Sequence, residues 1–133
     1  MNLGPRSAQA PPIINIIDAD ETVLATLKLA LEIEGFAVRA YSTWTGVFEN
    51  ADFIDGACMI IDQELPGLDG LELVAALRIG RIAAPVVLVA DHASELLQER
   101  AARAGIPIVE KPLLASTLLD CVRDAVQRQT RRH

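Results

Sequence analysis

The feature that most constrains the fold is an alternation of short apolar runs with segments of helical periodicity, repeated five times. The runs "CMII" and "VVLV" are apolar at every position, which is typical of strands covered by helices on both faces. Strand–helix–strand order requires right-handed crossovers between parallel strands. We therefore expect an α/β fold, a single (βα)5 doubly wound parallel sheet. The predicted strands are Ile13–Ile17, Ala37–Tyr41, Cys58–Ile61, Pro85–Ala90 and Pro107–Val109.

Five helices are predicted in the segments that follow the strands. A glycine follows three of them, at Gly35, Gly80 and Gly105, and a glycine in the left-handed conformation commonly ends a helix. We expect that conformation at all three positions. The predicted helices are Thr22–Glu34, Thr45–Ala51, Leu71–Ile79, Ser94–Ala104 and Leu114–Gln129.

Composition and charge limit the class of protein. The chain has 133 residues, 51% of them hydrophobic, which is enough for one domain with its own core. Its formal net charge is −6 and its basic residues are scattered, apart from a few arginines near the end. No continuous basic surface that would follow a nucleic-acid backbone is therefore evident in the sequence, and we expect no nucleic-acid partner. Cys58 and Cys121 lie in apolar contexts, which indicates reduced cysteines of a cytosolic protein.

We expect a soluble, cytoplasmic protein with no membrane partner. No uncharged apolar stretch reaches the roughly 18 residues that a spanning helix needs, and the N-terminus lacks the apolar core of an export signal. Residues 1–12, rich in Pro, Ala and polar residues, are interpreted as a flexible tail. Residues 13–129 form the predicted domain, and residues 130–133 a short basic tail.

Charged residues follow the strands at the carboxyl edge of the predicted sheet, where ligands of such folds collect. These residues are Asp18 and Asp20, Asp62 and Glu64, Asp91 and His92, and Glu110 and Lys111. Carboxylates held together repel one another unless a cation neutralises them, and Mg²⁺ accepts one or two carboxylates with water and phosphate oxygens. A lysine beside them suits a phosphoryl oxygen.

Several of these polar residues also have a simpler structural role. Asp20 and Asp69 each precede a predicted helix and are suited to cap it, and Asp91 and Ser94 are typical turn or cap residues. No helix starts directly behind Asp62, and Lys111 directly precedes a proline at the end of a buried strand. The functional interpretation is therefore strongest for these last two residues.

Three motifs in order resemble bacterial response-regulator receiver domains of the CheY-like type. They are "INIIDADE", "MIIDQELPGLDGLELV" and "IVEKPL", and the resemblance covers roughly residues 13–129. It implies strand order 2-1-3-4-5 and Asp62 as phosphoacceptor. It also implies a Mg²⁺ site formed by Asp18, Asp62 and the backbone carbonyl of Glu64. Lys111 would bind the phosphoryl group, across a Lys-Pro bond that is often cis.

The resemblance implies a phosphoacceptor protein of a two-component system rather than an enzyme. Its phosphoryl donor would be a sensor histidine kinase or a histidine phosphotransfer protein. The chain ends soon after the fifth helix, so we expect a stand-alone receiver that signals by protein contact. The face formed by the fourth and fifth predicted strands and helices, which carries Arg100 and Arg103, is a candidate for a homodimer contact. Arginines on a helix face are, however, commonly just solvated charges.

The chain departs from the family pattern at three positions. Ala19 occupies the place of a second acidic metal ligand, so Mg²⁺ binding is expected to be weakened. Ala90 replaces a Ser or Thr whose hydroxyl binds the phosphoryl group. Ile108 replaces an aromatic residue that rotates with activation. A phosphate without differential contacts in two states cannot shift their populations, so we expect impaired phosphorylation and a muted or rewired response.

Two other functions remain open on the sequence. One is a pseudo-receiver that never carries phosphate and serves as a docking module, which the three departures favour. The other is a haloacid-dehalogenase-type phosphatase using Asp18 and Asp20, suggested by "IIDADETVL". That motif lacks the expected glycine before Thr22, and no paired acids end a strand after Lys111. A flavin site is disfavoured because the first loop is acidic and lacks a phosphate cradle.

Overall fold

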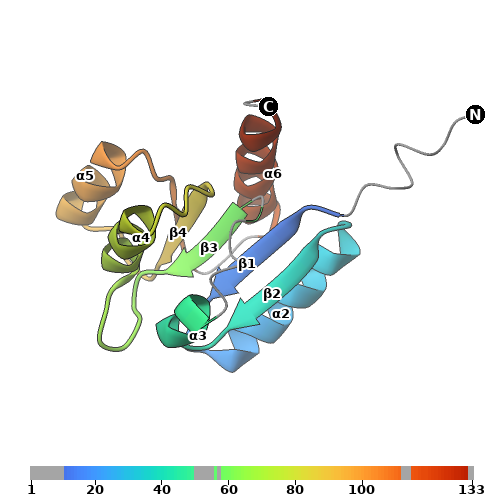
Figure 1. The fold of residues 1–133 in the computed structure, drawn as a ribbon, viewed down its shortest axis with the longest axis horizontal. Helices are drawn as coiled ribbons and strands as arrows, with labels where there is room; N and C mark the ends of the chain where they lie inside the picture. Colours follow the sequence, from blue (N-terminus) through green and yellow to red (C-terminus); the bar gives the residue numbers. More distant parts are fainter. Residues whose placement is uncertain (1–10, 50–55, 57, 112–114, 132–133) are drawn as a thin grey trace, which may run out of the picture.

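The computed structural model describes residues 11–49, 56, 58–111 and 115–131, and it has the predicted alternation of strands and helices (Figure 1). The strands are β1 (Ile13–Ile17), β2 (Ala37–Tyr41), β3 (Cys58–Asp62), β4 (Val86–Ala90) and β5 (Ile108–Glu110). The helices are α2 (Glu21–Ile33), α3 (Trp44–Glu49), α4 (Gly70–Ile79), α5 (Glu95–Arg103) and α6 (Ala115–Arg131).

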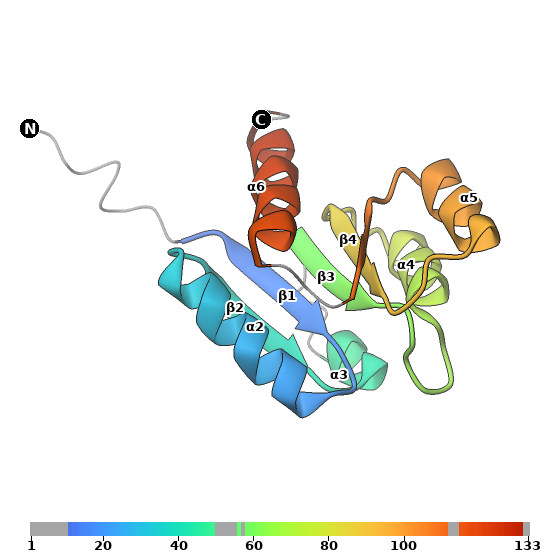
Figure 2. The same cartoon turned by 180° about the vertical axis from the view of Figure 1, so that it is seen from behind.

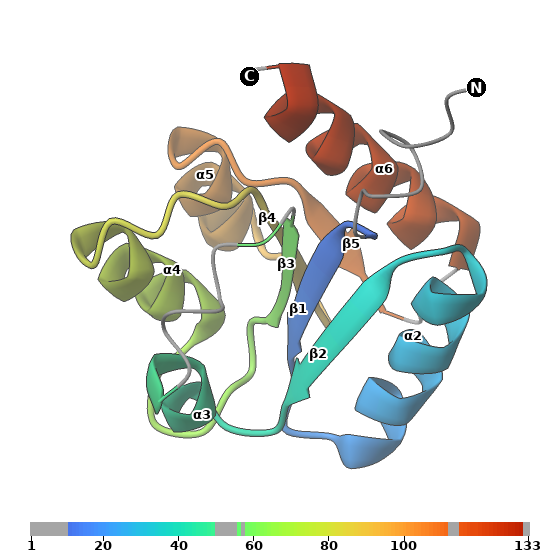
Figure 3. The same ribbon diagram turned by 45° about the vertical axis from the view of Figure 1, so that its right-hand side comes forward.

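The strands form one parallel sheet in the order β2-β1-β3-β4-β5, as predicted. Helices cover both of its faces. Helices α2 and α6 lie on one side, and α3, α4 and α5 lie on the other (Figures 2 and 3). The carboxyl ends of all five parallel strands therefore meet at one edge, which is where the predicted site residues follow.

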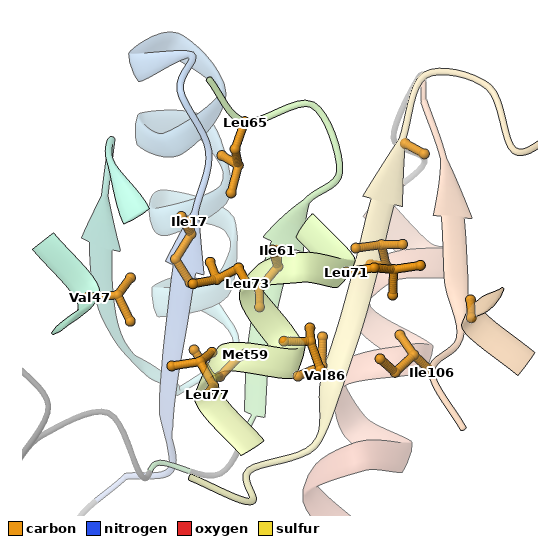
Figure 4. Packing of buried hydrophobic residues seen from close by; sticks show 14 of the residues in the cluster. Ile17, Val47, Met59, Ile61, Leu65, Leu71, Leu73, Leu77, Val86 and Ile106 are labelled. Atoms are coloured by element: carbon orange, nitrogen blue, oxygen red, sulfur yellow. The ribbon is translucent and has the colours of Figure 1, made fainter. Parts of the chain in front are cut away.

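Strand residues alternate between two cores, one under each helical layer. Met59 and Ile61 belong to the core under α4, while Cys58 and Ile60 belong to the core under α2 and α6. This alternation explains why β3 is apolar at successive positions, since both faces are buried. In Figure 4, Leu73 and Leu77 of α4 pack over β1 and β3; both side chains are fully buried.

The predicted end of α4 at Ile79 is confirmed, but the left-handed conformation expected at Gly80 is not observed. Gly35 and Gly105 have the expected left-handed φ of 98° and 72°, but Gly80 has an ordinary φ of −77°. The left-handed residue at the end of α4 is instead Arg81, with φ 65°. Its conformation lets the N–H of Ile82 donate to the Leu77 carbonyl at 2.9 Å, and Ile82 packs on the core. The left-handed residue thus lies one position later than the glycine rule predicts.

Other element boundaries agree within one or two residues. Helix α6 continues to Arg131, two residues beyond its predicted end. The carbonyl of Pro12, predicted in the tail, accepts a 2.9 Å hydrogen bond from the N–H of Ala37. Residues 50 and 51 of the predicted second helix lie outside the described residues. Across the described part of the chain, no helix has both the length and the apolar character to cross a membrane.

Both cysteines are free thiols, as predicted, but they differ in accessibility. Cys58 is fully buried, and this burial raises the pKa of its thiol to about 12. Cys121 on α6 is partly exposed, although partial burial and the charges of Asp120 and Asp124 also raise the pKa of its thiol. Because the thiolate is the reactive form, native protein is expected to expose one reactive thiol to Ellman's reagent, and denatured protein two. The Cys121→Ser variant, as control, should have none in its native state. Two rapidly reacting thiols in native wild-type protein would contradict this burial.

Candidate functional site

Strand register brings the first two predicted site residues together. Ile17 of β1 is paired with Ile61 of β3, so the next residues, Asp18 and Asp62, lie side by side at the carboxyl edge. Both are buried, with only 3% and 4% of their surface exposed. The Asp18 carboxylate accepts a 2.9 Å hydrogen bond from the N–H of Asp20, which orients it within the loop. Two buried carboxylates from neighbouring strands therefore share one small volume.

Lys111 follows β5 and reaches toward this pair. Its backbone N–H donates to the Ala90 carbonyl at 2.9 Å, which extends the β4–β5 pairing by one residue. Its Nζ lies 3.4 Å from Asp62 Oδ1 and 3.8 Å from Asp91 Oδ1. The side chains of Asp62 and Lys111 are therefore in contact, as the sequence predicts. Pro112, and with it the Lys-Pro bond, lies outside the described residues.

The site's electrostatics reflect the crowding of like charges. Burial raises the pKa of Asp18 above its ordinary value, the Asp20 N–H opposes this, and the negative charge of Asp62 raises it further. Burial alone would lower the pKa of Lys111, but the charges of Asp62 and Asp18 outweigh it, so the net pKa is raised. The ionised form of Asp18 is thus disfavoured here, while the ammonium of Lys111 is stabilised.

The start of α4 holds Gln63, the residue that directly follows Asp62. The N–H of Gly70 donates to the Gln63 carbonyl, and the N–H of Leu71 donates to Gln63 Oε1, both at 3.0 Å. A Cβ on Gly70 would lie 2.7 Å from the Asp62 carbonyl oxygen, closer than such contacts occur. The Asp-Gly pair was predicted only as a helix start, so the contacts of Gln63 and Gly70 beside Asp62 were not predicted.

Two glutamates anchor the loop between β4 and α5. Glu64 Oε1 accepts a 3.2 Å hydrogen bond from the N–H of Asp91, and Glu110 Oε2 accepts a 3.0 Å hydrogen bond from the N–H of Ala93. Partial desolvation raises the pKa of Glu64, the Asp91 N–H opposes this, and the charge of Asp62 adds to the rise. The Glu64 side chain is thus engaged with the loop.

The predicted capping roles are confirmed. Asp20 Oδ1 accepts hydrogen bonds from the N–H groups of Thr22 and Val23 at the start of α2. Asp69 forms a reciprocal capping box with Glu72, and Ser94 accepts from the N–H of Leu97. Asp20 is therefore engaged at a helix terminus, which weakens its candidacy as the acid/base of a phosphatase.

The three residues predicted to depart from the family pattern lie in strands of the sheet or in the loop that follows β1. Ala19 is exposed between Asp18 and Asp20 and brings no oxygen to the loop. Ala90 ends β4 fully buried, and Ile108 is half-buried against the core beneath α4 and α5. Ile108 is thus a packed aliphatic residue.

The donor set fits a magnesium ion held by two carboxylates. Asp18 and Asp62 are adjacent and buried, and their mutual repulsion is the kind that a bound cation relieves. Within residues 11–49, 56, 58–111 and 115–131, no group of three or more His, Cys, Asp and Glu side chains is arranged to hold a metal. The protein therefore offers fewer charged ligands than a three-acid pocket would.

Sequence comparisons support the resemblance. A family model described as the response regulator receiver domain matches residues 14–123. The transcriptional regulatory protein FixJ of Azorhizobium caulinodans is 27% identical over 116 residues, which are 86% of this chain and 55% of FixJ. KdpE of Mycobacterium tuberculosis is 29% identical over 119 residues, 89% of this chain and 52% of KdpE. The chain spans about half the length of these relatives.

Solved structures agree. A response regulator receiver domain protein from Clostridium thermocellum superposes with a TM-score of 0.80 at 25% identity, covering 92% of this chain and 99% of that one. A CheY-like receiver domain protein from Methanospirillum hungatei gives 0.84 at 23% identity, with coverage of 92% and 99%, and shows the same fold. The fold, the order of the strands and the match over residues 14–123 lead to one conclusion: the chain belongs to the response regulator receiver domain family.

Proposed function

We propose that this chain accepts a phosphoryl group on Asp62 from a histidine kinase or a histidine phosphotransfer protein and signals through protein contacts. Receiver domains are phosphoacceptor signalling modules that generally bind Mg²⁺ at an acidic site. The observation that carries the proposal is the 3.4 Å contact between Lys111 Nζ and Asp62 Oδ1, beside the second buried carboxylate of Asp18.

The chemistry requires few groups. An oxygen of the Asp62 carboxylate attacks the phosphorus of a phosphohistidine in line, an O–P bond forms, and the P–N bond breaks with its electron pair returning to the imidazole. Lys111 stabilises negative charge on the phosphoryl oxygens as a compact point charge. Mg²⁺, held by Asp18, Asp62 and the Glu64 carbonyl, would supply further charge neutralisation.

The proposed receiver is impaired in two separate ways. The missing oxygen at Ala19 costs one charged ligand, on the order of 1.5–3 kcal/mol, or roughly ten- to a hundredfold in ion affinity. The missing hydroxyl at Ala90 affects the response instead, since the phosphoryl group has no side-chain donor at the end of β4. We therefore propose weak Mg²⁺ binding and a conformational response that differs from the family pattern.

Phosphotransfer tests the proposal. With a labelled histidine kinase and Mg²⁺, wild-type protein is expected to acquire acid-stable, base-labile label, and Asp62→Asn none. Asp91→Asn is the matched control, because this exposed carboxylate also contacts Lys111 but is not the proposed acceptor; it should retain label. Equal labelling of wild type and Asp62→Asn would remove Asp62 from the role.

A second candidate function is a docking module that does not depend on phosphate. The specific observation in its favour is the β4–α5 loop, which the side chains of Glu64 and Glu110 anchor through hydrogen bonds to its backbone. A magnesium titration by calorimetry separates the two functions. Absence of binding at tens of millimolar Mg²⁺, far above the range of weak carboxylate sites, would favour the docking module.

A further inference from the structure

A groove lies between α4 and the C-terminal half of α5, away from the phosphorylation site. It has a volume of about 460 Å³, within the usual range for binding pockets. Its apolar lining consists of the buried residues Leu71, Val74 and Ile106 and the small, exposed residues Ala75 and Ala104. The two helices lie side by side on the same face of the sheet in Figures 1 and 3. We name this feature the α4–α5 groove.

Arginines line the groove, although the protein as a whole is acidic. Arg78 comes from α4, and Arg100 and Arg103 come from α5, and the described residues lining this groove include no carboxylate. An adjoining hollow of about 250 Å³ shares Arg78, Ala104 and Ile106 with it and adds Arg128 of α6. Four arginines therefore follow one surface of a chain whose formal net charge is −6.

The arginines differ in how far their charge is already neutralised. Arg100 lies 3.7 Å from Asp69, and Arg128 lies 3.3 Å from Asp124. Arg78 donates to the carbonyls of Ile82 and Ala84, which fixes its guanidinium at the groove. Arg103 is exposed and forms no ion pair with any carboxylate in the described part of the chain. The groove thus keeps a net positive charge at its rim.

We propose that the α4–α5 groove docks an acidic, amphipathic peptide segment of a partner protein. Aliphatic side chains of the segment would lie over Ala75 and Ala104, and its carboxylates would pair with Arg103 and Arg100 in the bidentate geometry that guanidinium groups favour. The net negative charge of the rest of the protein repels an acidic partner, so the positively charged α4–α5 groove also fixes the orientation in which the partner binds. An apolar base and a strongly acidic chain both disfavour a nucleic acid as the occupant.

The groove and the proposed phosphoacceptor site share no residue. The residues lining the groove include none of Asp18, Asp62 and Lys111. The segment is therefore expected to bind Asp62→Asn as tightly as wild type. This separates the inference from the proposed function, since either can fail while the other holds.

Fluorescence anisotropy with a labelled peptide tests the inference. The probe is an amphipathic peptide of about eleven residues, three helical turns, with glutamates on one face and leucines on the other. Wild-type protein is expected to bind it with an affinity that falls as salt rises. Arg103→Glu should weaken binding by about fivefold or more, and the milder Arg103→Gln by less. Ala75→Leu, which fills the groove without changing charge, should weaken binding by a similar factor.

Lys28→Glu is the matched control, because Lys28 is exposed on α2 and the charge change is the same. It should leave the affinity within about twofold of wild type, since its charge is distant and screened. The inference is overturned if Lys28→Glu and Arg103→Glu weaken binding equally. It is also overturned if Ala75→Leu has no effect, or if oligodeoxythymidine of matched charge displaces the peptide as well as unlabelled peptide does. Circular dichroism of each variant confirms that it is folded.

Discussion

Replacing Gly70 with alanine is expected to lower the free energy of unfolding by about 2 kcal/mol, the usual cost of overpacking a well-filled site. The added Cβ would lie 2.7 Å from the Asp62 carbonyl oxygen, 2.8 Å from Leu88 Cδ1 and 2.9 Å from Gln63 Cα. Two of these three atoms belong to the backbone, which cannot move aside as a side chain can. The gain in helix propensity from glycine to alanine, at most about 1 kcal/mol, offsets only part of this cost.

Gly80→Ala is the matched control at the other end of α4. There the nearest atom, the Leu77 carbonyl oxygen, is 3.4 Å from the built Cβ, and φ is −77°, which alanine adopts freely. This substitution is expected to stabilise the protein by about 0.5 kcal/mol, because it reduces the entropy of the unfolded chain. Thermal unfolding should therefore shift in opposite directions for the two variants, with Gly70→Ala melting roughly 6–10 °C lower than wild type.

Gly70→Ala is also expected to slow phosphotransfer, because the added Cβ presses on the backbone of Asp62, the proposed acceptor. If Gly70→Ala unfolds like wild type, the contact between α4 and Asp62 is less tight than the structure indicates. If it loses stability but transfers phosphate at the wild-type rate, α4 contributes to stability without positioning Asp62. Measuring both quantities on both glycine variants separates these outcomes.

Local patterns were sufficient to predict most of the fold. Apolar runs without alternation correctly indicated a sheet buried on both faces. Capping residues such as Asp69 and Ser94 correctly indicated helix starts, because each accepts a hydrogen bond from the residue three positions further along the chain. The edge residues Asp62 and Lys111 were found because parallel strands bring their carboxyl ends together. These features depend on short-range spacing or on topology, and both are readable from the chain.

Contacts that depend on tertiary packing could not be predicted in this way. The anchoring of Asp91 by Glu64 spans 27 residues, and no local pattern indicates it. The N–H of Ile82 bonds back to the Leu77 carbonyl through a left-handed Arg81, so the left-handed conformation predicted at Gly80 was wrong although the helix end was right. Arg100 and Arg103 were interpreted as part of a candidate dimer face or as solvated charges. The groove that they line became visible only from the arrangement of α5 beside α4.

Replacing Ala19 with aspartate is expected to raise Mg²⁺ affinity by roughly ten- to a hundredfold, because it adds a charged oxygen ligand beside Asp18 and Asp62. Without the ion, the same change brings a third carboxylate to a place where burial and Asp62 already raise the pKa of Asp18. The variant should therefore be less stable than wild type in chelator and gain more stability from Mg²⁺. Calorimetric titration and thermal unfolding with and without Mg²⁺ measure the two effects.

Ala25→Asp is the control for added charge, since Ala25 is exposed on α2 outside the proposed site. It should leave the Mg²⁺ affinity near that of wild type and lower stability equally with and without the ion. A gain of tenfold in affinity corresponds to about 1.4 kcal/mol of additional stabilisation at saturating Mg²⁺. If Ala19→Asp and Ala25→Asp respond to Mg²⁺ alike, residue 19 does not face the ion and the weakness of the site has another origin. If only Ala19→Asp responds, the missing ligand at this position limits ion binding, and any remaining defect in signalling belongs to Ala90 and Ile108.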